Sequence, residues 1–535
     1  MKRILIFIYA ITILTLLTEN SCNSQIWSPD LGNGKYKNPI IWADYSDPDI
    51  IRVGDDFYMT TSSFNCVPAL PILHSTDLVN WEIINHAVRR LPDQYYDVVQ
   101  HGNGVWAPCI RYHKGWFYIY WGDPDRGIYM VRTQDPKGEW EAPVLVKKAY
   151  GNIDSSPLWD DDGRVYLVHA FANSRAGVSH VLQIQELTAD GSEVTTNREI
   201  VIQGLPENTT LEGPKFYKRN GYYYIFAPAG GVPTGWQMVY RSKNVFGPYE
   251  EKRVLEQGTT NINGPHQGGW VELENGESWF VHFQELQPYG RIVHLQPVKW
   301  VDDWPVMGID EDGDGTGFPV VEYQKPEVKI KSGIKVPQTS DEFNADHYNL
   351  AWQWMANYYD HWYSLTKNKG NLRLYSQYNP NPGSIWMVPN IIAQKLPAPE
   401  FMVTTKMDGS NLKEKEKAGL AMMGLSYSTL TLAPKGDDFE LKLAICKSAD
   451  KGYSEQIVEK VQVSGGVIYL RLTYTKDAKC QYSYSEDNKT FIDIGEPVTV
   501  TELKWIGAKI GLFAVSTKET GIKGYADFDW FRITE

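Results

Sequence analysis

The chain has 535 residues with a globular composition, 42% hydrophobic, 13% aromatic and 22% charged, and a net charge of −13 at pH 7. This length predicts several domains or two large ones, and the composition excludes disordered, collagen-like and coiled-coil chains. The acidic balance disfavours nucleic acid as a partner, because phosphates are neutralised by clustered Lys and Arg. Five cysteines, none in a Cys-x-x-Cys pair, indicate neither a disulfide framework nor a zinc ribbon.

The first 22 residues have the pattern of a secretory signal peptide. Lys2 and Arg3 precede an apolar run at 4–17, which is shorter than the ~20 residues that span a bilayer as a helix. No later apolar stretch reaches about 18 residues, so we predict no transmembrane span in the mature chain. Export across the inner membrane is the expected fate.

The end of this signal leaves two outcomes open. Ser21-Cys22 resembles the end of a bacterial lipoprotein signal, in which Cys22 would be lipidated and would anchor the chain. Glu19 departs from the apolar residue usual at that position, so simple cleavage is the alternative. No acidic cluster follows Cys22 that would mark the protein for surface display, and we therefore expect a periplasmic location.

One pattern recurs five times in the first half of the chain. Each copy has a polar or aromatic lead residue, an apolar strand, a turn containing Gly or Asp, and an aromatic strand, which together predict a hairpin. The lead residues, 59, 48, 58 and 54 positions apart, are Asp47, Trp106, Asp154, Glu212 and His266. Periods near 50 with several strands each are typical of propeller blades. We therefore predict a five-bladed β-propeller over residues 35–323.

The propeller gives the lead residues a common location. The innermost strand of every blade lines the central channel, so equivalent positions converge on one axis. Three carboxylates, an aromatic ring and a histidine would then surround a single pocket. Paired carboxylates are the equipment of glycoside hydrolysis, in which one protonates the departing oxygen and the other acts on the anomeric carbon. The third can raise the pKa of the acid by its negative charge.

A second domain follows a linker at 324–339. From residue 340 to residue 535, short alternating runs are separated by turns rich in Asn, Gly and Lys, which predicts an antiparallel β-sandwich. Four tryptophans of this domain could stack on sugars or fill the sandwich and the domain interface, and packing is the favoured interpretation. They are Trp352, Trp354, Trp362 and Trp386.

Longer motifs around the lead residues resemble glycoside hydrolase family 43. In the first domain they lie at 38–41, 47–52, 55–58, 61–64, 106–108, 153–154, 212–214 and 290–291. In the second domain, residues 340–343 and 350–354 are similar to the start of the family's accessory concanavalin-like sandwich. The resemblance therefore spans nearly the whole mature chain, with its motifs in the correct order.

The resemblance implies a role for each carboxylate. Asp47 would be the general base, Glu212 the general acid, and Asp154 the residue that tunes the pKa of the acid and orients it. The mechanism implied is inverting, with Asp47 activating a water on the face opposite Glu212. Asp154 is followed by Ser155 and Ser156, where members of the family often have Pro directly after the Asp. This departure affects the local turn at Asp154.

The resemblance also implies which residues bind the terminal sugar. Phe64 and Trp106 would wall the terminal subsite, Arg291 would bind its hydroxyls, and His266 would lie beneath the substrate. Pocket-shaped, exo-acting members carry such a sandwich, with a loop from it at one side of the pocket. Val67 is smaller than the Phe that we associate with xylosidases of the family, which leaves room for a branched sugar.

The expected function is therefore an exo-acting α-L-arabinofuranosidase, with exo-β-1,4-xylosidase as the alternative. The substrate would be a plant hemicellulose oligosaccharide of the arabinoxylan or xyloglucan type. Fructan hydrolases share the propeller, but their Asn-Asp-Pro-Asn string is absent here. A non-catalytic carbohydrate-binding protein is a further alternative, against which the three carboxylates argue, because negative charge adds nothing to stacking on neutral sugars.

No metal or other cofactor is expected. Asp310, Asp312 and Asp314 match the first half of a calcium-binding EF-hand loop, but its twelfth position is Val321 instead of Glu. No helical pattern flanks the loop. A solvated loop at the end of the propeller is the favoured interpretation, and a structural calcium ion has no support.

Overall fold

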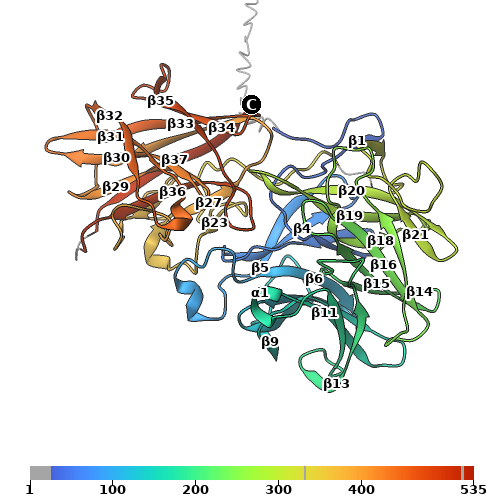
Figure 1. Ribbon diagram of the computed structural model, residues 1–535. Coiled ribbons are helices and arrows are strands. Elements are labelled where there is room, and N and C mark those ends of the chain that lie inside the picture. Colours follow the sequence, from blue (N-terminus) through green and yellow to red (C-terminus); the bar gives the residue numbers. More distant parts are fainter. Residues whose placement is uncertain (1–25, 331–332, 520–522) are drawn as a thin grey trace, which may run out of the picture.

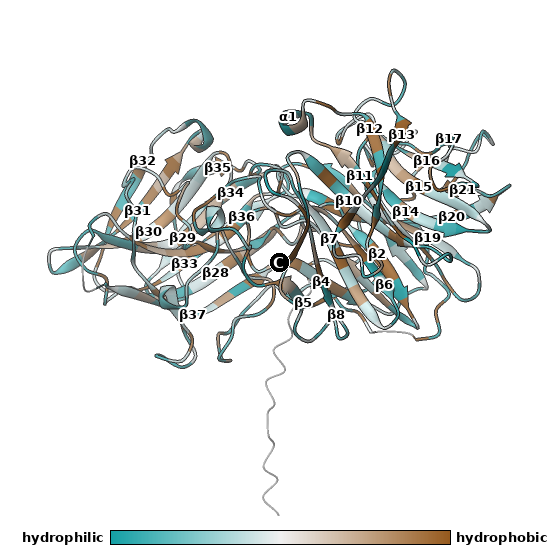
Figure 2. Cartoon of the chain, turned by 90° about the horizontal axis from the view of Figure 1, so that it is seen from below, coloured by the Kyte–Doolittle hydropathy of each residue, from teal (hydrophilic) through white to brown (hydrophobic). Residues whose placement is uncertain are grey.

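A computed structural model describes residues 26–330, 333–519 and 523–535 (Figure 1). The predicted signal peptide, Cys22 included, lies outside these residues. The described chain is almost all β, and its helices are α1 (Asn173–Ala176), η1 (Gln94–Asp97), η2 (Asp360–Trp362) and η3 (Ala449–Lys451). In the part described, no helix has the length and apolar character to cross a membrane. Two domains lie side by side in Figures 1 and 2.

The first domain is a five-bladed propeller, as predicted, with each blade a four-stranded antiparallel sheet in chain order. The first blade consists of β2 (Asp49–Val53), β3 (Asp56–Thr60), β4 (Ala69–Ser75) and β5 (Glu82–Val88). The second consists of β6 (Trp106–His113), β7 (Trp116–Asp123), β8 (Gly127–Thr133) and β9 (Val144–Lys148). The third consists of β10 (Asn152–Trp159), β11 (Val165–Phe171), β12 (Val181–Leu187) and β13 (Val194–Gln203). The fourth consists of β14 (Lys215–Arg219), β15 (Tyr222–Ala229), β16 (Trp236–Ser242) and β17 (Glu250–Leu255), and the fifth of β18 (His266–Glu272), β19 (Ser278–Leu286), β20 (Gly290–Val301) and β21 (Trp304–Met307).

The predicted hairpins form between the first two strands of each blade. Between β14 and β15, Asn220 and Gly221 have φ of 49° and 72°, the left-handed pair that a tight hairpin turn requires. The two ends of the domain are then joined, because β1 (Lys35–Lys37) pairs antiparallel with β22 (Glu322–Gln324). This pairing fixes the first blade relative to the fifth.

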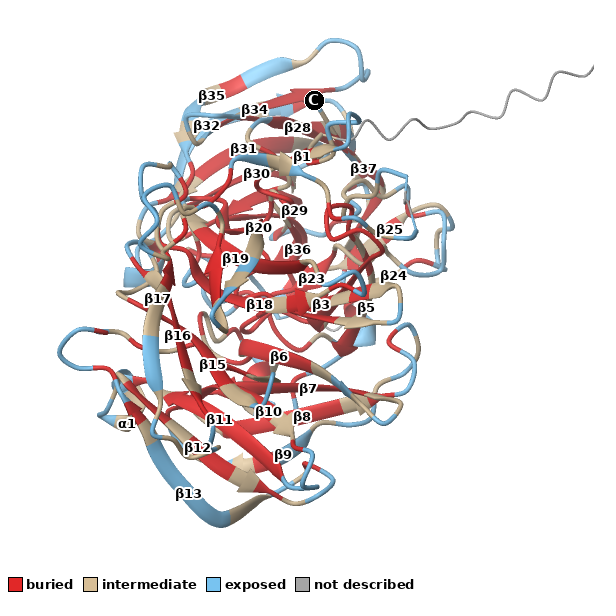
Figure 3. Ribbon diagram, turned by 90° about the vertical axis from the view of Figure 1, so that its right-hand side faces the viewer, coloured by how far each residue is buried: buried red, intermediate tan, exposed pale blue. Residues whose placement is uncertain are grey.

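The first strands of the blades surround the propeller axis. β2 lies against β6 and β18, and β10 lies against β6 and β14. Figure 3 shows the inner strands β6, β10 and β18 largely buried, whereas the outermost strand of the third blade, β13, is mostly exposed. A buried polar network ties three inner strands together. Arg111 donates through Nη1 to Asp49 Oδ2 (2.7 Å) and through Nη2 to Ser156 Oγ (3.0 Å).

The second domain is a β-sandwich, again as predicted, built from an eight-stranded and a seven-stranded sheet. The eight-stranded sheet contains β23 (Gln353–Trp354), β26 (Gln377–Tyr378), β27 (Ile392–Lys395), β29 (Glu416–Met423), β30 (Tyr427–Lys435), β31 (Asp438–Cys446), β32 (Gln456–Val463) and β36 (Lys509–Ser516). The seven-stranded sheet contains β24 (Tyr363–Ser364), β25 (Leu372–Tyr375), β28 (Phe401–Asp408), β33 (Val467–Thr475), β34 (Lys479–Ser485), β35 (Ile492–Thr499) and β37 (Tyr525–Thr534). Strands such as β33 alternate strictly between buried and more exposed residues, which places one face of each in the core.

The two domains are joined by backbone as well as side-chain contacts. Val67 of the propeller and Trp354 of the sandwich exchange two backbone hydrogen bonds, of 3.0 and 2.6 Å. Asn65 Nδ2 donates to the carbonyl oxygen of Met355 (2.7 Å). Of the four tryptophans considered for sugar stacking, Trp352, Trp354 and Trp362 are buried, as the packing interpretation predicts. The fourth, Trp386, is only partly buried.

Candidate active site

The five lead residues of the repeat do meet in one pocket at the propeller axis. The pocket encloses about 510 Å³, solvent at its mouth included. Its lining consists of Asp47, Phe64, Trp106, Ala107, Ile153, Asp154, Glu212, Val232, His266, Gln267, Arg291 and Trp505. All seven residues that the sequence assigned to a site in the propeller are among them.

Three of the inner strands carry a β-bulge at the lead residue. The register of the blade's first hairpin shifts between Trp106 and Cys109, between Ile153 and Ser156, and between His266 and Gly268. A bulge re-aims a side chain and increases the local twist, and it is common beside active sites. The bulge in β10 takes in Asp154 and Ser155, where the motif departs from the family pattern. The repeat therefore brings the lead residues to the axis, and the bulges re-aim three of them, Trp106, Asp154 and His266.

Asp47 is held at both carboxylate oxygens. Its Oδ1 accepts a hydrogen bond from Arg291 Nη1 at 2.8 Å, and its Oδ2 accepts one from Ser62 Oγ at 2.5 Å. Its backbone lies in the left-handed region with φ of 54°, a conformation rare outside glycine and often found at functional sites. The carboxylate thus has one orientation, and Arg291 balances its charge.

Contacts of both its backbone and its guanidinium hold Arg291 in place. Its N–H donates to Asp44 Oδ1 at 2.9 Å, and its guanidinium lies over the ring of Phe283. Its Nε has no hydrogen-bond partner among the described residues. Arg291 therefore positions Asp47, while its predicted role toward sugar hydroxyls stays a prediction.

The negative charge of Asp154 acts on the carboxyl group of Glu212. Asp154 Oδ2 accepts a hydrogen bond from the backbone N–H of Gly213 at 2.8 Å, which favours its charged form. Glu212 keeps 27% of its side chain exposed, at the pocket. Burial, followed by the negative charge of Asp154, raises the pKa of Glu212. Burial also raises the pKa of Asp154, but the Gly213 N–H opposes this, so we expect Asp154 to ionise first and to keep Glu212 protonated.

His266 lies next to the proposed acid. Its Nε2 is 3.6 Å from Glu212 Oε1, and its side chain is almost fully buried. Burial, with a smaller contribution from Arg291, lowers the pKa of His266 to about 3, so the imidazole is neutral at neutral pH. A neutral ring does not compensate the charge of Glu212 and leaves the raised pKa of the acid intact.

Aromatic side chains from both domains wall the pocket. The rings of Phe64 and Trp106 lie 6.2 Å apart, and Trp106 Nε1 donates to the carbonyl oxygen of Gly102 at 2.9 Å. Trp505 of the sandwich meets Trp106 edge to face at 6.4 Å. A sandwich loop therefore does close one side of the pocket. Trp505 is not among the site residues predicted from the sequence, because nothing in the spacing of the second domain indicates which of its loops faces the propeller.

Gln267 is a second residue that the sequence analysis missed. It follows the lead residue of the fifth repeat, is buried, and has φ of 34°. Its Oε1 has no hydrogen-bond partner among the described residues. Its place directly after His266 in the repeat is the signal that could have found it.

Val67 does not lie at the sugar pocket, where the prediction of a branched sugar requires it. It is fully buried, pairs with Trp354, and is not among the residues that line the pocket. A smaller residue at this position therefore does not widen the pocket. The preference for arabinofuranose loses its structural basis.

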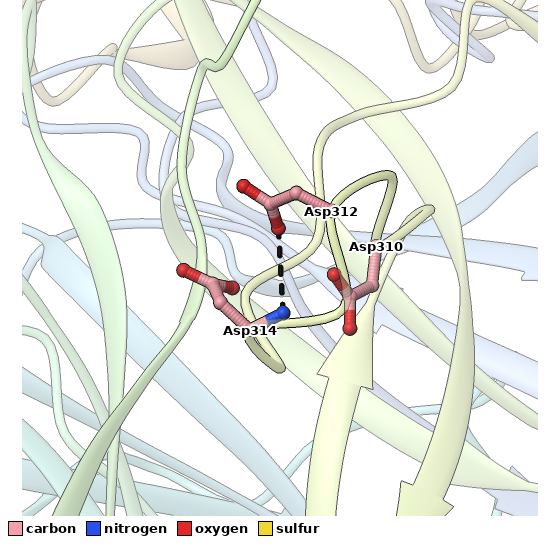
Figure 4. Close-up of side chains that lie close together, drawn as sticks. All are labelled: Asp310, Asp312 and Asp314. Carbon is pink, nitrogen blue, oxygen red and sulfur yellow. Dashed lines mark hydrogen bonds between the residues drawn. The ribbon is translucent and has the colours of Figure 1, made fainter.

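The acidic loop between β21 and β22 is shown in Figure 4. One oxygen each of Asp310, Asp312 and Asp314 lies within 4.8 Å of the others. The carboxylates accept hydrogen bonds from amides of their own loop, such as Gly313 N to Asp310 Oδ1 at 2.7 Å. The interpretation as a solvated loop stays a prediction.

Three carboxyl groups in one aromatic-walled pocket of a five-bladed propeller fit glycoside hydrolysis, which uses a pair of carboxyl groups. The chain matches the family model of glycosyl hydrolases family 43 over residues 36–305. It also matches that of the beta xylosidase C-terminal concanavalin A-like domain over residues 340–534. The chain belongs to glycosyl hydrolase family 43, as the sequence motifs indicated.

The similarity to known proteins covers nearly the whole chain. A beta-xylosidase of Formosa agariphila is 31% identical, over 98% of this chain and 97% of that protein. A non-reducing end alpha-L-arabinofuranosidase of Bacteroides ovatus is 29% identical, over 96% and 99%. The crystal structure of a xylan beta-1,4-xylosidase from Bacillus halodurans C-125 superimposes with a TM-score of 0.82 at 25% identity, over 93% of this chain and all of that one.

Asp154→Asn is expected to move the alkaline limb of the pH–rate profile to lower pH. The negative charge of Asp154 disfavours ionisation of Glu212, so its removal lets Glu212 lose its proton at lower pH. Part of the raised pKa should remain, because burial is its larger cause. The measurement is kcat/KM against pH on an unactivated oligosaccharide, whose leaving group needs the proton of Glu212. If the alkaline limb did not move, Asp154 would serve only to orient the site.

Proposed function

We propose that the enzyme removes single D-xylosyl residues from the non-reducing ends of β-linked xylo-oligosaccharides derived from hemicellulose. The observation that carries the proposal is the pocket at the propeller axis, where the three carboxyl groups meet at an end walled by Phe64, Trp106 and Trp505. A pocket walled in this way suits a terminal sugar, with the leaving group extending toward the mouth.

The proposed chemistry assigns the proton transfers to two residues. Glu212, protonated because of its raised pKa, gives its proton to the departing oxygen. Asp47, oriented by Arg291 and Ser62, takes a proton from the attacking water on the opposite face. Attack from the face opposite the leaving group inverts the anomeric configuration.

Two considerations support xylose over arabinofuranose. Val67, the residue that favoured arabinofuranose, is buried outside the pocket. The relative from Formosa agariphila and the superimposable Bacillus halodurans protein are both described as xylosidases. Release of α-L-arabinofuranose is a second candidate function, favoured by the similarity to the Bacteroides ovatus enzyme over nearly the full length of both chains.

The test compares two aryl glycosides with one purified sample. We expect a higher kcat/KM for the aryl β-D-xyloside than for the aryl α-L-arabinofuranoside, and α-D-xylose as the first anomer seen by NMR. The reverse preference would select the second candidate. A first product with β configuration would contradict the inverting mechanism, and no release from either glycoside would overturn the proposed function.

A further inference from the structure

We propose that a groove between the propeller and the sandwich binds the sugar chain attached to the residue being removed, and that it takes a neutral chain. The inference rests on the proposed function, because it assigns the leaving-group side of the same reaction. The groove encloses about 1240 Å³, open solvent included. Its cavity volume of about 620 Å³ lies within the range of about 300–1,000 Å³ typical of small-molecule sites, so a short oligosaccharide has room there.

Both domains line the groove. The propeller contributes Val99, Gln100, His101, Asn103, Glu285 and Gln287. The sandwich contributes Trp386, Met387, Asp450, Glu502, Lys504 and Trp505, among others. Trp505 also lines the catalytic pocket, so the groove and the pocket adjoin at this side chain. A chain that leaves the scissile bond past Trp505 enters this groove.

Trp505 is held in an unfavourable conformation at this junction. Its φ is 68°, although it is bulky, and 49% of its surface is exposed. Such conformations persist only where the surroundings impose them, and they cluster at ligand clamps. The surroundings include Gly102, at which an added Cβ would lie 2.7 Å from Trp505 Cδ1 and 2.9 Å from Lys504 Cγ. Glycine at this position lets the sandwich loop rest on the propeller.

Trp386 and Met387 provide an apolar surface farther along the groove. The ring of Trp386 stacks on that of His101 with centroids 3.7 Å apart. His101 Nε2 donates a hydrogen bond to the carbonyl oxygen of Trp386 at 2.9 Å. Met387 is 53% exposed. A partly exposed indole supported by a stacked ring is a rigid platform of the kind that sugar rings pack on.

The walls of the groove are firmly connected. Leu503 is buried in an apolar cluster that includes Phe64 and Val99 of the propeller, with Trp386 packed against it. Within the sandwich, Leu425 N donates to the carbonyl oxygen of Glu502 at 2.6 Å. The groove is therefore preformed, which reduces the entropy lost on binding.

The charges of the groove select against acidic chains. In the lining, Asp450 and Glu502 oppose one cation, Lys504. Glu285 is paired with Arg291, whose Nε lies 3.9 Å from Glu285 Oε1. His101 adds no positive charge near neutral pH, because burial lowers its pKa to about 4. The amides of Gln100, Asn103 and Gln287 carry no charge. An unsubstituted pentose chain meets no repulsion here, whereas a chain with uronic acid substituents does.

The experiment measures the ratio of kcat/KM on xylotetraose to kcat/KM on an aryl β-D-xyloside. We expect Trp386→Ala to lower this ratio about tenfold through a higher KM for the tetraose, and Trp386→Phe to restore most of it. Met387→Ala should lower it about threefold. The matched control is Tyr378→Ala, an aromatic residue 48% exposed outside the groove, for which the wild-type ratio is expected. The wild type should also prefer xylotetraose to a tetraose carrying a uronic acid.

The outcomes separate the two proposals. An unchanged ratio in both Trp386→Ala and Met387→Ala overturns the groove assignment while the enzyme remains a xylosidase. If Trp386→Ala does not fold, Met387→Ala alone decides, because its side chain is largely exposed. Equal rates on acidic and neutral chains overturn the charge argument. If the wild type released sugar from none of these glycosides, the proposed function itself would be overturned.

Discussion

Replacing Asp47 by Asn is expected to abolish turnover of every glycoside, whatever its leaving group. The attacking water loses the group that takes its proton, a contribution of about 10²–10⁴-fold, and a better leaving group does not replace it. The amide keeps one acceptor oxygen but turns an N–H₂ group toward Arg291 Nη1 or Ser62 Oγ, which further disturbs the orientation. The measurement is kcat on an activated aryl glycoside and on an unactivated oligosaccharide.

Two controls accompany this variant. Ser62→Ala removes the 2.5 Å bond to Asp47 Oδ2 while keeping the carboxylate, so a smaller loss is expected. Asp312→Asn changes an exposed carboxylate of the acidic loop and should leave kcat at the wild-type value. If Asp47→Asn kept substantial activity on the activated substrate, the base would have to be sought among the other carboxyl groups of the pocket.

The repeat was enough to predict the propeller and most of its site. Strand alternation and turn residues are local features, and their recurrence at a period near 50 gave both the blade count and the lead residues, such as Asp47 and Glu212. Because blades are equivalent by symmetry, equal positions in sequence become neighbours at the axis. That inference needs no knowledge of side-chain packing.

What the sequence did not predict depends on packing between distant segments. The bulges at Trp106, Asp154 and His266 arise from strand pairing, which the residues of one strand alone do not determine. Trp505 reaches the pocket only because the two domains dock, with Gly102 making room for it. The prediction that Val67 leaves room for a branched sugar was wrong for the same reason, because the burial of Val67 against Trp354 follows from the domain interface.

Glu212→Gln is expected to lower activity by about 10²–10⁴-fold on poor leaving groups and far less on activated aryl glycosides. An activated leaving group departs without a proton, so the acid matters little for it. The alkaline limb gives a second readout. In the wild type, activity falls as the pH rises through the raised pKa of Glu212, because the acid then loses its proton. Gln does not titrate, so in Glu212→Gln this limb should disappear from the residual activity on the unactivated substrate.

The matched control is Glu207→Gln, five positions earlier in the chain and exposed, which should keep both the rate and the alkaline limb. Equal losses on the two substrate types would remove Glu212 from the role of acid. So would an alkaline limb that persists in Glu212→Gln, because another group would then carry the proton. Asp154 would be the next candidate, since burial also raises its pKa. Its hydrogen bond from Gly213 N–H favours the charged form, however, and a charged carboxylate has no proton to give.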